Sequence, residues 1–386
     1  MTTGGDESRL IQYLQARDDV DFEHVVLVGM DQSGASVALN GPLFERFRAT
    51  GVEVVPMGVP SDHEQRRQGR TPRVMLGQGR AFGQIVTRLA RTMRERGVDL
   101  VDGRVNMGTA MGTLAARMAG VRAVVSTNYE LSPFQSPATW PLGQAVYAMT
   151  DALVSDSQDA IDSMRRWMVR PPPGYNIPNG VVPPAPSRPA AEVRAALDIP
   201  ADARVVGQVA RLQHIKGQDL LLQAAPRVLA AHPDVIFLLV GYRQLAADYQ
   251  AGLDRLVEQH GLQDRVRFVS WPGPVGDVWQ IIDVHAHPTR RDSSPMALME
   301  GMSLGRPAVT TKIGGIPEIV TNEETGLVIA PDDVDALAGA LLRLLGDEAL
   351  ARRLGQAAHA RYLARHQPAT MARAIEALYR QLHARR

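Results

Sequence analysis

The chain has 386 residues with nearly balanced charge, since 42 lysines and arginines against 41 aspartates and glutamates give a formal net charge of +1. This length favours two or three domains, the 45% apolar and 22% charged residues are typical of folded proteins, and the balanced charge argues against nucleic acid as a partner. The sequence contains no cysteine, which excludes disulfides and thiol chemistry, and its only lysines are Lys216 and Lys312.

The start of the chain does not have the pattern of a targeting segment. Met1–Arg17 is polar and lacks the apolar core of a signal peptide, and no run of the sequence reaches the ~18 apolar residues that cross a bilayer. We therefore expect a cytoplasmic protein without stable membrane insertion.

Short apolar runs alternate with helical stretches from one end of the sequence to the other. Val235–Gly241 is a near-continuous run of Val, Ile and Leu, which is typical of a strand covered on both faces in a parallel sheet. The alternation predicts an α/β protein with doubly wound sheets. The predicted strands are His24–Gly29, Val52–Met57, Leu100–Arg104, Ala123–Thr127, Ala152–Ser155, Tyr175–Pro178, Val205–Arg211, Val235–Gly241, Val266–Trp271, Val284–Pro288, Ala308–Thr311 and Gly326–Ala330.

Proline-rich stretches divide the chain near its middle. Pro171-Pro-Pro-Gly174 and Pro183-Pro-Ala-Pro186 flank one short strand, and proline suits connections because it fixes φ and donates no hydrogen bond. We expect an N-terminal Rossmann-like domain over 1–182 and a C-terminal one over 183–368. The last helix, 369–386, has one apolar face and is predicted to pack back on the first domain. Such sheets bind ligands at the carboxyl ends of their strands, in a cleft between the domains.

Two cations lie in the loop that follows the strand Val205–Arg211. Arg211 and Lys216 are five residues apart, and the next predicted helix begins near Gln218. A planar guanidinium and a compact ammonium beside a helix N-terminus are suited to phosphate oxygens. Two solvated loop cations are the alternative, which the scarcity of lysine and the adjacent Gly217 make weaker.

Two acids follow the strand Val284–Pro288. Asp292 lies just before a helix that we expect to begin with Ser294 as the N-cap and Pro295 in the first turn, and Glu300 lies on that helix. The two carboxylates can bind hydroxyls of a polar ligand, whereas a solvated helix face is the ordinary alternative. Gly314 follows the strand after that and allows close approach of the backbone, although a plain turn explains it equally well.

Together these motifs resemble, in order and spacing, the family 4 retaining glycosyltransferases. The resemblance implies a GT-B fold, with two Rossmann-like domains and the donor nucleotide-sugar held mainly by the second. It also implies that no metal or other cofactor is needed, because cationic side chains neutralise the diphosphate. The motifs are Asn176-Ile-Pro-Asn179-Gly180-Val181, Arg211 with Lys216-Gly217, Asp292-x7-Glu300, Gly314-Gly-Ile-Pro-Glu318 and Gly326-Leu-Val-Ile-Ala-Pro331-Asp.

The resemblance assigns roles to these residues. Arg211 and Lys216 would bind the donor diphosphate, and Glu300 would accept hydrogen bonds from the ribose. Asp292 stands where the family usually has a glutamate that holds a sugar hydroxyl, and its side chain is one methylene shorter. Further donor contacts are expected at Ser293, Ser294, Met296 and Gly314.

The first half of the chain offers weaker candidates. Gly34 lies in a loop that resembles the glycine loop of the family. Where the family often has a histidine near the reacting sugar, this chain offers Asn128, whose amide binds hydroxyls but does not titrate near neutral pH. Arg104, Asn106 and Glu130 are further candidates for acceptor or sugar contacts, with ordinary loop positions as the alternative.

Three aromatic or imidazole side chains remain. Trp271, at a strand end, is interpreted as a core residue or as the border of the nucleobase site. His285 and His287 alternate on one strand and could face the same side like metal ligands. Because no third ligand accompanies them, we interpret them as a packed pair and expect no metal site.

We predict a retaining hexosyltransferase that moves a sugar from a nucleoside-diphosphate sugar, most commonly a UDP-sugar, to a hydroxyl of a small polar acceptor. The arginine, alanine and proline usage is typical of a GC-rich bacterial genome, and an aminocyclitol of antibiotic biosynthesis is the predicted acceptor class. The alternatives are a glycosyltransferase for lipid-linked or surface glycans, a sugar-nucleotide epimerase, and a non-catalytic sugar-nucleotide-binding protein.

Overall fold

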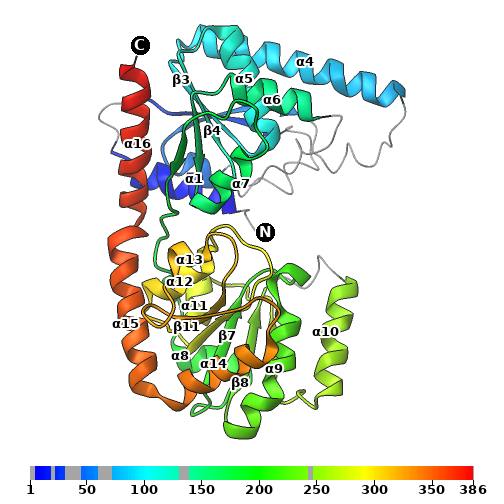
Figure 1. Ribbon diagram of the computed structural model, residues 1–386, viewed down its shortest axis with the longest axis vertical. Coiled ribbons are helices and arrows are strands. Elements are labelled where there is room, and N and C mark those ends of the chain that lie inside the picture. The colour runs from blue at the N-terminus through cyan, green and yellow to red at the C-terminus, as the bar shows by residue number, and fades with distance from the viewer. Residues whose placement is uncertain are drawn as a thin grey trace. The chain divides into compact units, whose positions relative to one another are not determined.

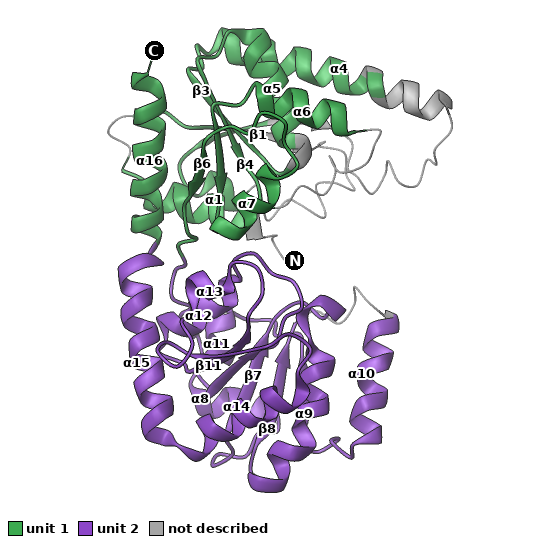
Figure 2. Ribbon diagram, viewed as in Figure 1, with its two compact units in different colours: residues 1–180, 368–386 green, residues 181–367 purple. Residues whose placement is uncertain are grey.

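The computed structural model describes residues 5–18, 22–30, 45–59, 72–129, 139–241 and 247–385. The chain divides into two compact units, one formed by Met1–Gly180 with Pro368–Arg386 and the other by Val181–Gln367 (Figure 2). Each unit is an α/β structure whose strands pair in parallel, which confirms the predicted fold class. In the described part of the chain, no helix combines the length and the apolar character needed to span a membrane.

Unit 1 contains a four-stranded sheet in the order β3-β4-β5-β6 and a separate parallel pair, β1 with β2. Helices α1 and α16 cover one face of the four-stranded sheet, and α4 to α7 cover the other (Figure 1). The elements are α1 (Gly5–Ala16), β1 (Val25–Met30), β2 (Glu53–Val59), α4 (Pro72–Glu95), β3 (Leu100–Arg104), α5 (Asn106–Ala119), β4 (Ala123–Thr127), α6 (Trp140–Ala148), β5 (Ala152–Ser155), α7 (Gln158–Arg165), β6 (Gly174–Asn176) and α16 (Pro368–Ala384).

Unit 2 contains a six-stranded parallel sheet in the order β9-β8-β7-β10-β11-β12. The chain therefore starts in the middle with β7, builds outward to β9, returns to β10 beside β7 and builds outward again. The elements are α8 (Ala190–Ala196), β7 (Val205–Val209), the 3₁₀ turn η2 (His214–Lys216), α9 (Gln218–Ala231), β8 (Ile236–Val240), α10 (Ala247–Gln259), β9 (Val266–Val269), α11 (Val275–Trp279), β10 (Val284–His287), α12 (Met296–Ser303), β11 (Ala308–Thr311), α13 (Ile316–Ile319), β12 (Leu327–Ile329), α14 (Val334–Gly346) and α15 (Glu348–Arg365).

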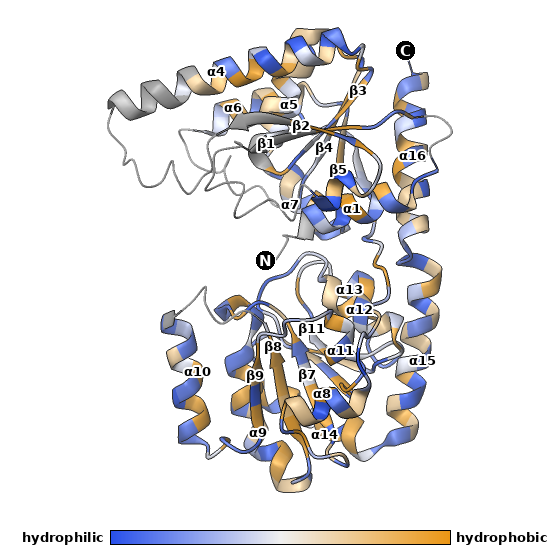
Figure 3. Ribbon diagram, turned by 180° about the vertical axis from the view of Figure 1, so that it is seen from behind, coloured by the Kyte–Doolittle hydropathy of each residue, from blue (hydrophilic) through white to orange (hydrophobic). Residues whose placement is uncertain are grey.

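The apolar runs form buried strands because both faces of the unit 2 sheet are covered. On β8, Phe237 and Leu239 face a core with α9, α10 and α14, whereas Ile236 and Leu238 face a second core with α8 and α11. Figure 3 shows β8 as hydrophobic along its length. Alternate residues of a strand point to opposite faces, so a strand with helices on both sides is apolar throughout.

The polar face of β10 is an exception to this pattern. Val284 and Ala286 belong to the core with α9 and α14. His285 and His287 therefore point to the other side of the sheet, where the ring of His285 packs edge-on against Trp279 with the ring centroids 4.9 Å apart. The histidine pair lies on the face of the sheet that carries α11 and α12.

Candidate functional site

The candidate residues of unit 2 follow the carboxyl ends of β7 and β10. These two strands are adjacent in the sheet, and the chain direction across the sheet reverses between them. In open α/β sheets this reversal leaves a crevice at the carboxyl edge, where ligands bind. The loop with Arg211 and Lys216 follows β7, and the loop with Asp292 follows β10.

Two glycines hold these loops closely together. Gly217 has φ of +69°, and a Cβ atom there would lie 2.0 Å from the carbonyl oxygen of Pro288. Gly314 has φ of +50°, and a Cβ atom there would lie 1.9 Å from the carbonyl oxygen of Asp292. Both positions need glycine for conformation and for space. The glycines of the sequence motifs thus bring the loops after β7, β10 and β11 into contact.

Lys216 and Asp292 form an ion pair across these loops. The Lys216 ammonium donates to Asp292 Oδ2, and the two side chains are 13% and 15% exposed. The same Oδ2 atom lies 3.3 Å from Nε2 of His287, whose side chain is 2% exposed. Residues far apart in the sequence therefore meet at one carboxylate oxygen.

The ionisation of this group follows from its partners. Burial acts to raise the pKa of Asp292, but the hydrogen bond with His287 and the charge of Lys216 outweigh it and hold that pKa below its ordinary value. Burial also lowers the pKa of His287, and this effect exceeds the opposing influence of Asp292. Near neutral pH, Asp292 is a carboxylate and His287 is a neutral imidazole.

Arg211 is exposed and lies in the same loop as Lys216, between β7 and α9. Its carbonyl oxygen accepts a hydrogen bond of 2.9 Å from Gln218 Nε2, which fixes the backbone. Among the residues that the structure describes, no acid pairs with its guanidinium. An exposed guanidinium of this kind, in the same loop as a partly buried ammonium, is suited to an incoming anion.

Glu300 lies one turn into α12 and is partly buried. Its Oε2 atom accepts a hydrogen bond of 2.9 Å from the indole Nε1 of Trp279, which is itself fully buried. Burial raises the pKa of Glu300, and the indole donor only partly offsets this. The carboxylate is held in place by one donor and retains capacity for further hydrogen bonds.

The start of α12 differs from the predicted one. The helix begins at Met296 with Pro295 as its N-cap, and no side chain caps it. Ser294 therefore lies one position before the N-cap and is not the capping residue, because Pro295 still has extended backbone with ψ of 117°. Ser293, Ser294 and Met296 lie between Asp292 and the first helical turn, at the carboxyl edge of the sheet.

The ion pair of Arg290 with Asp219 was not identified from the sequence. It supports the loop of residues 210–217, which carries Arg211 and Lys216 and is called the cation loop below. Arg290 makes two hydrogen bonds to the carboxylate of Asp219, at 2.8 and 2.6 Å, and a third to His214 O at 2.7 Å. Its Nε also donates to Asp332 Oδ1 at 2.5 Å. Hydrogen bonds to Asp219 raise the pKa of Arg290 further, so the charge is permanent. The pair fastens the cation loop to the start of α9, and only the run of two arginines before Asp292 could have indicated it.

Trp271 is engaged away from this group. Its indole Nε1 donates to Asp277 Oδ2 at 3.1 Å, and the guanidinium of Arg188 lies 5.7 Å from its ring centroid. Asp277 also accepts from the backbone of Ser187 at 2.5 Å. Within the described residues, Trp271 thus joins the segment before α8 to α11, which favours its structural interpretation.

The candidates of unit 1 have mostly internal contacts. Arg104 donates to Asp102 at 2.9 Å and to the Tyr129 hydroxyl at 3.2 Å, and Tyr379 of α16 donates to the same aspartate at 3.0 Å. Asn128 is 1% exposed, and its amide nitrogen donates to Thr109 at 2.8 Å and to Ser126 at 2.7 Å.

These placements disfavour a direct sugar contact, because both side chains already serve the fold of unit 1. A sugar or acceptor contact at Arg104 and Asn128 therefore stays a prediction, and the contacts described for both side chains are within unit 1. Asn106 is the first residue of α5, and its side chain is not described. Gly34 and Glu130 lie outside the described residues.

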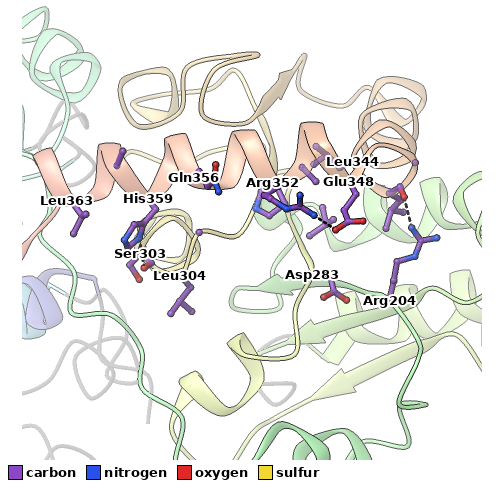
Figure 4. A pocket seen from close by; sticks show the side chains of 17 residues that line it. Arg204, Asp283, Ser303, Leu304, Leu344, Glu348, Arg352, Gln356, His359 and Leu363 are labelled. Atoms are coloured by element: carbon purple, nitrogen blue, oxygen red, sulfur yellow. Dashed lines mark hydrogen bonds and ion pairs between the residues drawn. The ribbon is translucent and has the colours of Figure 1, made fainter.

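A cavity of about 960 Å³ occupies the opposite edge of the unit 2 sheet (Figure 4). It is bordered by Arg204 and Asp283, which precede β7 and β10, and by side chains of α15, including the Arg352–Glu348 pair. The cavity contains none of the candidate residues. It lies at the amino ends of the strands, where this fold does not place its ligand crevice.

Two family models match the chain and divide it much as the structure does. Residues 190–361 match "Glycosyl transferases group 1", and residues 8–180 match "Glycosyl transferase 4-like domain". The two matches together take in most of the chain. The chain belongs to the glycosyltransferases.

Curated relatives of this glycosyltransferase include a D-inositol 3-phosphate glycosyltransferase of Corynebacterium urealyticum, 32% identical over 239 residues, which cover 60% of this chain and 55% of the relative. A lipopolysaccharide core biosynthesis mannosyltransferase, LpsB of Rhizobium meliloti, is 32% identical over 199 residues, 50% of this chain and 55% of that protein. The chain spans about half the length of these relatives.

Solved structures show the same GT-B fold. Anabaena Alr3699/HepE, in a complex with UDP and glucose, superposes with a TM-score of 0.78 at 21% identity, covering 98% of this chain and 97% of that one. Sucrose-phosphate synthase of Thermosynechococcus elongatus superposes with a TM-score of 0.77 at 23% identity, covering 100% of this chain and 95% of that one. At this identity the likeness concerns the fold.

Proposed function

We propose that the protein is a retaining glycosyltransferase that moves a sugar from a nucleoside-diphosphate sugar to a hydroxyl of a small polar acceptor. The observation that carries the proposal is the contact between Lys216 and Asp292, with Arg211 in the same loop as Lys216, after the adjacent strands β7 and β10. It combines cations for a diphosphate with a carboxylate for a sugar hydroxyl, in the crevice of a glycosyltransferase domain.

The chemistry requires charge stabilisation rather than a nucleophilic side chain. As the bond from the sugar to the diphosphate oxygen breaks, negative charge grows on the leaving group, and Lys216 and Arg211 stabilise it. The acceptor oxygen bonds to the same sugar carbon on the face that the diphosphate leaves, and its proton passes to a diphosphate oxygen. Asp292 orients the sugar, and Glu300 binds the ribose.

A UDP-sugar is the proposed donor, and a cyclitol hydroxyl is the proposed acceptor. HepE binds UDP and glucose, and several relatives are named for inositol 3-phosphate, a phosphorylated cyclitol. These names favour a phosphorylated cyclitol over the aminocyclitol predicted from the sequence, and a role in antibiotic biosynthesis stays a prediction. Transfer to a surface glycan is the second candidate, favoured by the likeness to LpsB.

A donor-by-acceptor screen with mass-spectrometric detection tests the proposal. UDP-glucose, UDP-N-acetylglucosamine and GDP-mannose are each combined with inositol 3-phosphate, myo-inositol, an aminocyclitol and a lipopolysaccharide core oligosaccharide. We expect one glycosylated cyclitol with the anomeric configuration of the donor, the same yield with EDTA present, and diphosphate release that depends on the acceptor. Release without acceptor would favour an epimerase or a hydrolase, and tight donor binding without any product would favour a binding protein.

A further inference from the structure

His287 is the buried neighbour of the candidate sugar-binding carboxylate. It lies at the end of β10, five residues before Asp292, and its Nε2 atom is 3.3 Å from Asp292 Oδ2. The Lys216 ammonium contacts the same oxygen. Asp292 Oδ1 has no hydrogen-bond partner among the residues that the structure describes, and the side chain remains 15% exposed. One oxygen thus faces the protein, and the other is available to a ligand.

The contacts of His287 define its tautomer. An ionised carboxylate only accepts hydrogen bonds, so Nε2 must carry the proton. The other ring nitrogen, Nδ1, is buried without a hydrogen-bond partner in the described part of the structure. A bare Nδ1 lone pair there is less costly than a buried N–H without an acceptor. The ring therefore acts as a fixed neutral donor directed at Asp292.

The Nε2–H donor of His287 matters because Asp292 has a shorter side chain than the glutamate that the family usually has at this position. An aspartate has one rotatable bond fewer than a glutamate and reaches less far from the backbone, so its position depends on what lies behind it. Lys216 approaches from the loop after β7, and His287 approaches from β10 beneath, with His285 as the next ring at 5.6 Å. Gly314, in the loop after β11, lies close to the Asp292 backbone, since a Cβ atom at Gly314 would lie 1.9 Å from the Asp292 carbonyl oxygen.

We propose that His287 is a positioning residue that holds Asp292 Oδ2 through its Nε2 proton, so that Oδ1 is presented to a hydroxyl of the donor sugar. The proposal rests on the proposed function for the sugar and on the geometry of unit 2 for the contact. The histidine pair of β10, interpreted from the sequence as packing alone, is thereby divided into a packing residue, His285, and a positioning residue, His287.

Ligand binding to the full chain tests the presentation of Oδ1. UDP-glucose is the probe and UDP is the sugar-free control, titrated by calorimetry from pH 5 to 8 against wild type, His287→Leu and His287→Gln. We expect His287→Leu to lower the affinity for UDP-glucose about tenfold and to change the affinity for UDP by less than about twofold. His287→Gln, which keeps a donor near the Nε2 position, should recover most of the loss.

The pH dependence separates positioning from packing. The titratable groups that face Asp292 are Lys216 and His287, and the lost donor should raise the pKa of Asp292. As the pH falls, His287→Leu should then lose UDP-glucose affinity at a higher pH than wild type. Any of three results would overturn the proposal. His287→Leu could lose as much affinity for UDP as for UDP-glucose, its loss of UDP-glucose affinity at low pH could match that of wild type, or His287→Gln could fail to recover binding.

Ring-nitrogen NMR of the wild-type protein gives a measurement without ligand. With ¹⁵N-histidine labelling and assignment through His287→Gln, we expect the neutral Nε2–H tautomer, and Asp292→Asn should shift the Nε2 resonance. The Nδ1–H tautomer would overturn the proposal even if UDP-glucose binds. A wild type that binds neither nucleotide would contradict the proposed function, while the tautomer still decides whether His287 holds Asp292.

Discussion

Lys216 is the residue whose position determines how the site is interpreted. Its ammonium contacts Asp292, and it comes from a loop that also carries the exposed Arg211. An ion pair at a ligand crevice has two uses, because the same ammonium that holds the carboxylate can also stabilise a diphosphate. The other lysine, Lys312, is exposed and offers a control of the same residue type.

Lys216→Ala is expected to lower turnover about 100-fold to 1,000-fold, because it removes a cation directed at the charge that grows on the leaving diphosphate. The thermal midpoint should fall by only a few degrees, because Asp292 keeps its contact with His287. Initial rates at saturating donor and circular-dichroism melting measure the two effects. Lys312→Ala should retain turnover within about twofold, and equal rates for both variants would contradict the role of Lys216.

Glu300→Gln is expected to change stability and binding in opposite directions. Burial raises the pKa of Glu300, so the folded state holds this proton more tightly than the unfolded chain and wild type loses stability as the pH rises above the ordinary glutamate value. The variant should therefore gain stability relative to wild type between pH 4 and pH 7. Its donor affinity should fall about tenfold, because a charged acceptor for the ribose is lost.

Chemical denaturation at each pH and calorimetry with UDP measure these two effects of Glu300→Gln. Glu258→Gln, on the exposed side of α10, is the matched control. A stability difference that does not change with pH would show that the Glu300 carboxyl is not perturbed by burial.

At the scale of elements, the site depends on backbone approach between three loops. The loops after β7, β10 and β11 contact one another through glycines that no other residue could replace without displacing a carbonyl group. The adjacent strand β8 ends in the same way, since a Cβ atom at Gly241 would lie 2.1 Å from the carbonyl oxygen of Ala210. The geometry of the carboxyl edge is therefore encoded in small residues as much as in charged ones.

Gly314→Ala is expected to destabilise the protein by about 1–3 kcal/mol, because the added Cβ atom meets the Asp292 carbonyl and the backbone has positive φ. It should also weaken UDP-glucose binding by displacing Asp292. Gly339→Ala is the control, since Gly339 lies within α14 with open space around it and should gain about 0.5–1 kcal/mol. Denaturant titration compares the two variants, and equal stability would contradict the close approach.

At the scale of the whole molecule, each unit has hydrophobic cores of its own, and the end of the chain returns to unit 1. Helix α16 contributes Met371, Ile375 and Leu378 to the core of unit 1, where they pack with Ile11 of α1. The described cores of unit 2, including the one built from β7, β8, α9 and α14, contain no residue of α16. The last helix is therefore a structural part of the unit that the chain builds first.

Ile375→Ala is expected to cost about 2–5 kcal/mol, because Ile375 is 4% exposed in the unit 1 core. Native-state hydrogen exchange should show lost protection in α1 and β4 and unchanged protection in β7 and β8. Leu337→Ala, at 1% exposure in α14, should give the reverse pattern. Loss of protection in β8 on substitution of Ile375 would contradict the separate cores.

Much of the fold was predictable because burial on both faces of a sheet leaves a direct trace in the sequence. All twelve predicted strands occur, and their ends differ from the predicted ones by at most two residues. The start of α12 was not predicted correctly, because serine is a common N-cap and the choice between Ser294 and Pro295 depends on backbone angles set by the packed loop.

The sequence by itself determined the α/β class, and it predicted a division into two domains and the candidate cations and carboxylates of unit 2, because periodicity, proline and charge are local properties. Only the tertiary structure decided that Lys216 and Asp292 share an oxygen with His287, that Arg290 fastens the cation loop, and that Asn128 is buried in unit 1. Those contacts join residues up to 76 positions apart. The strand order of the sheet brings them together, and spacing along the chain does not specify that order. The near-zero net charge is thus compatible with a cation site that exists only once β7 and β10 lie side by side.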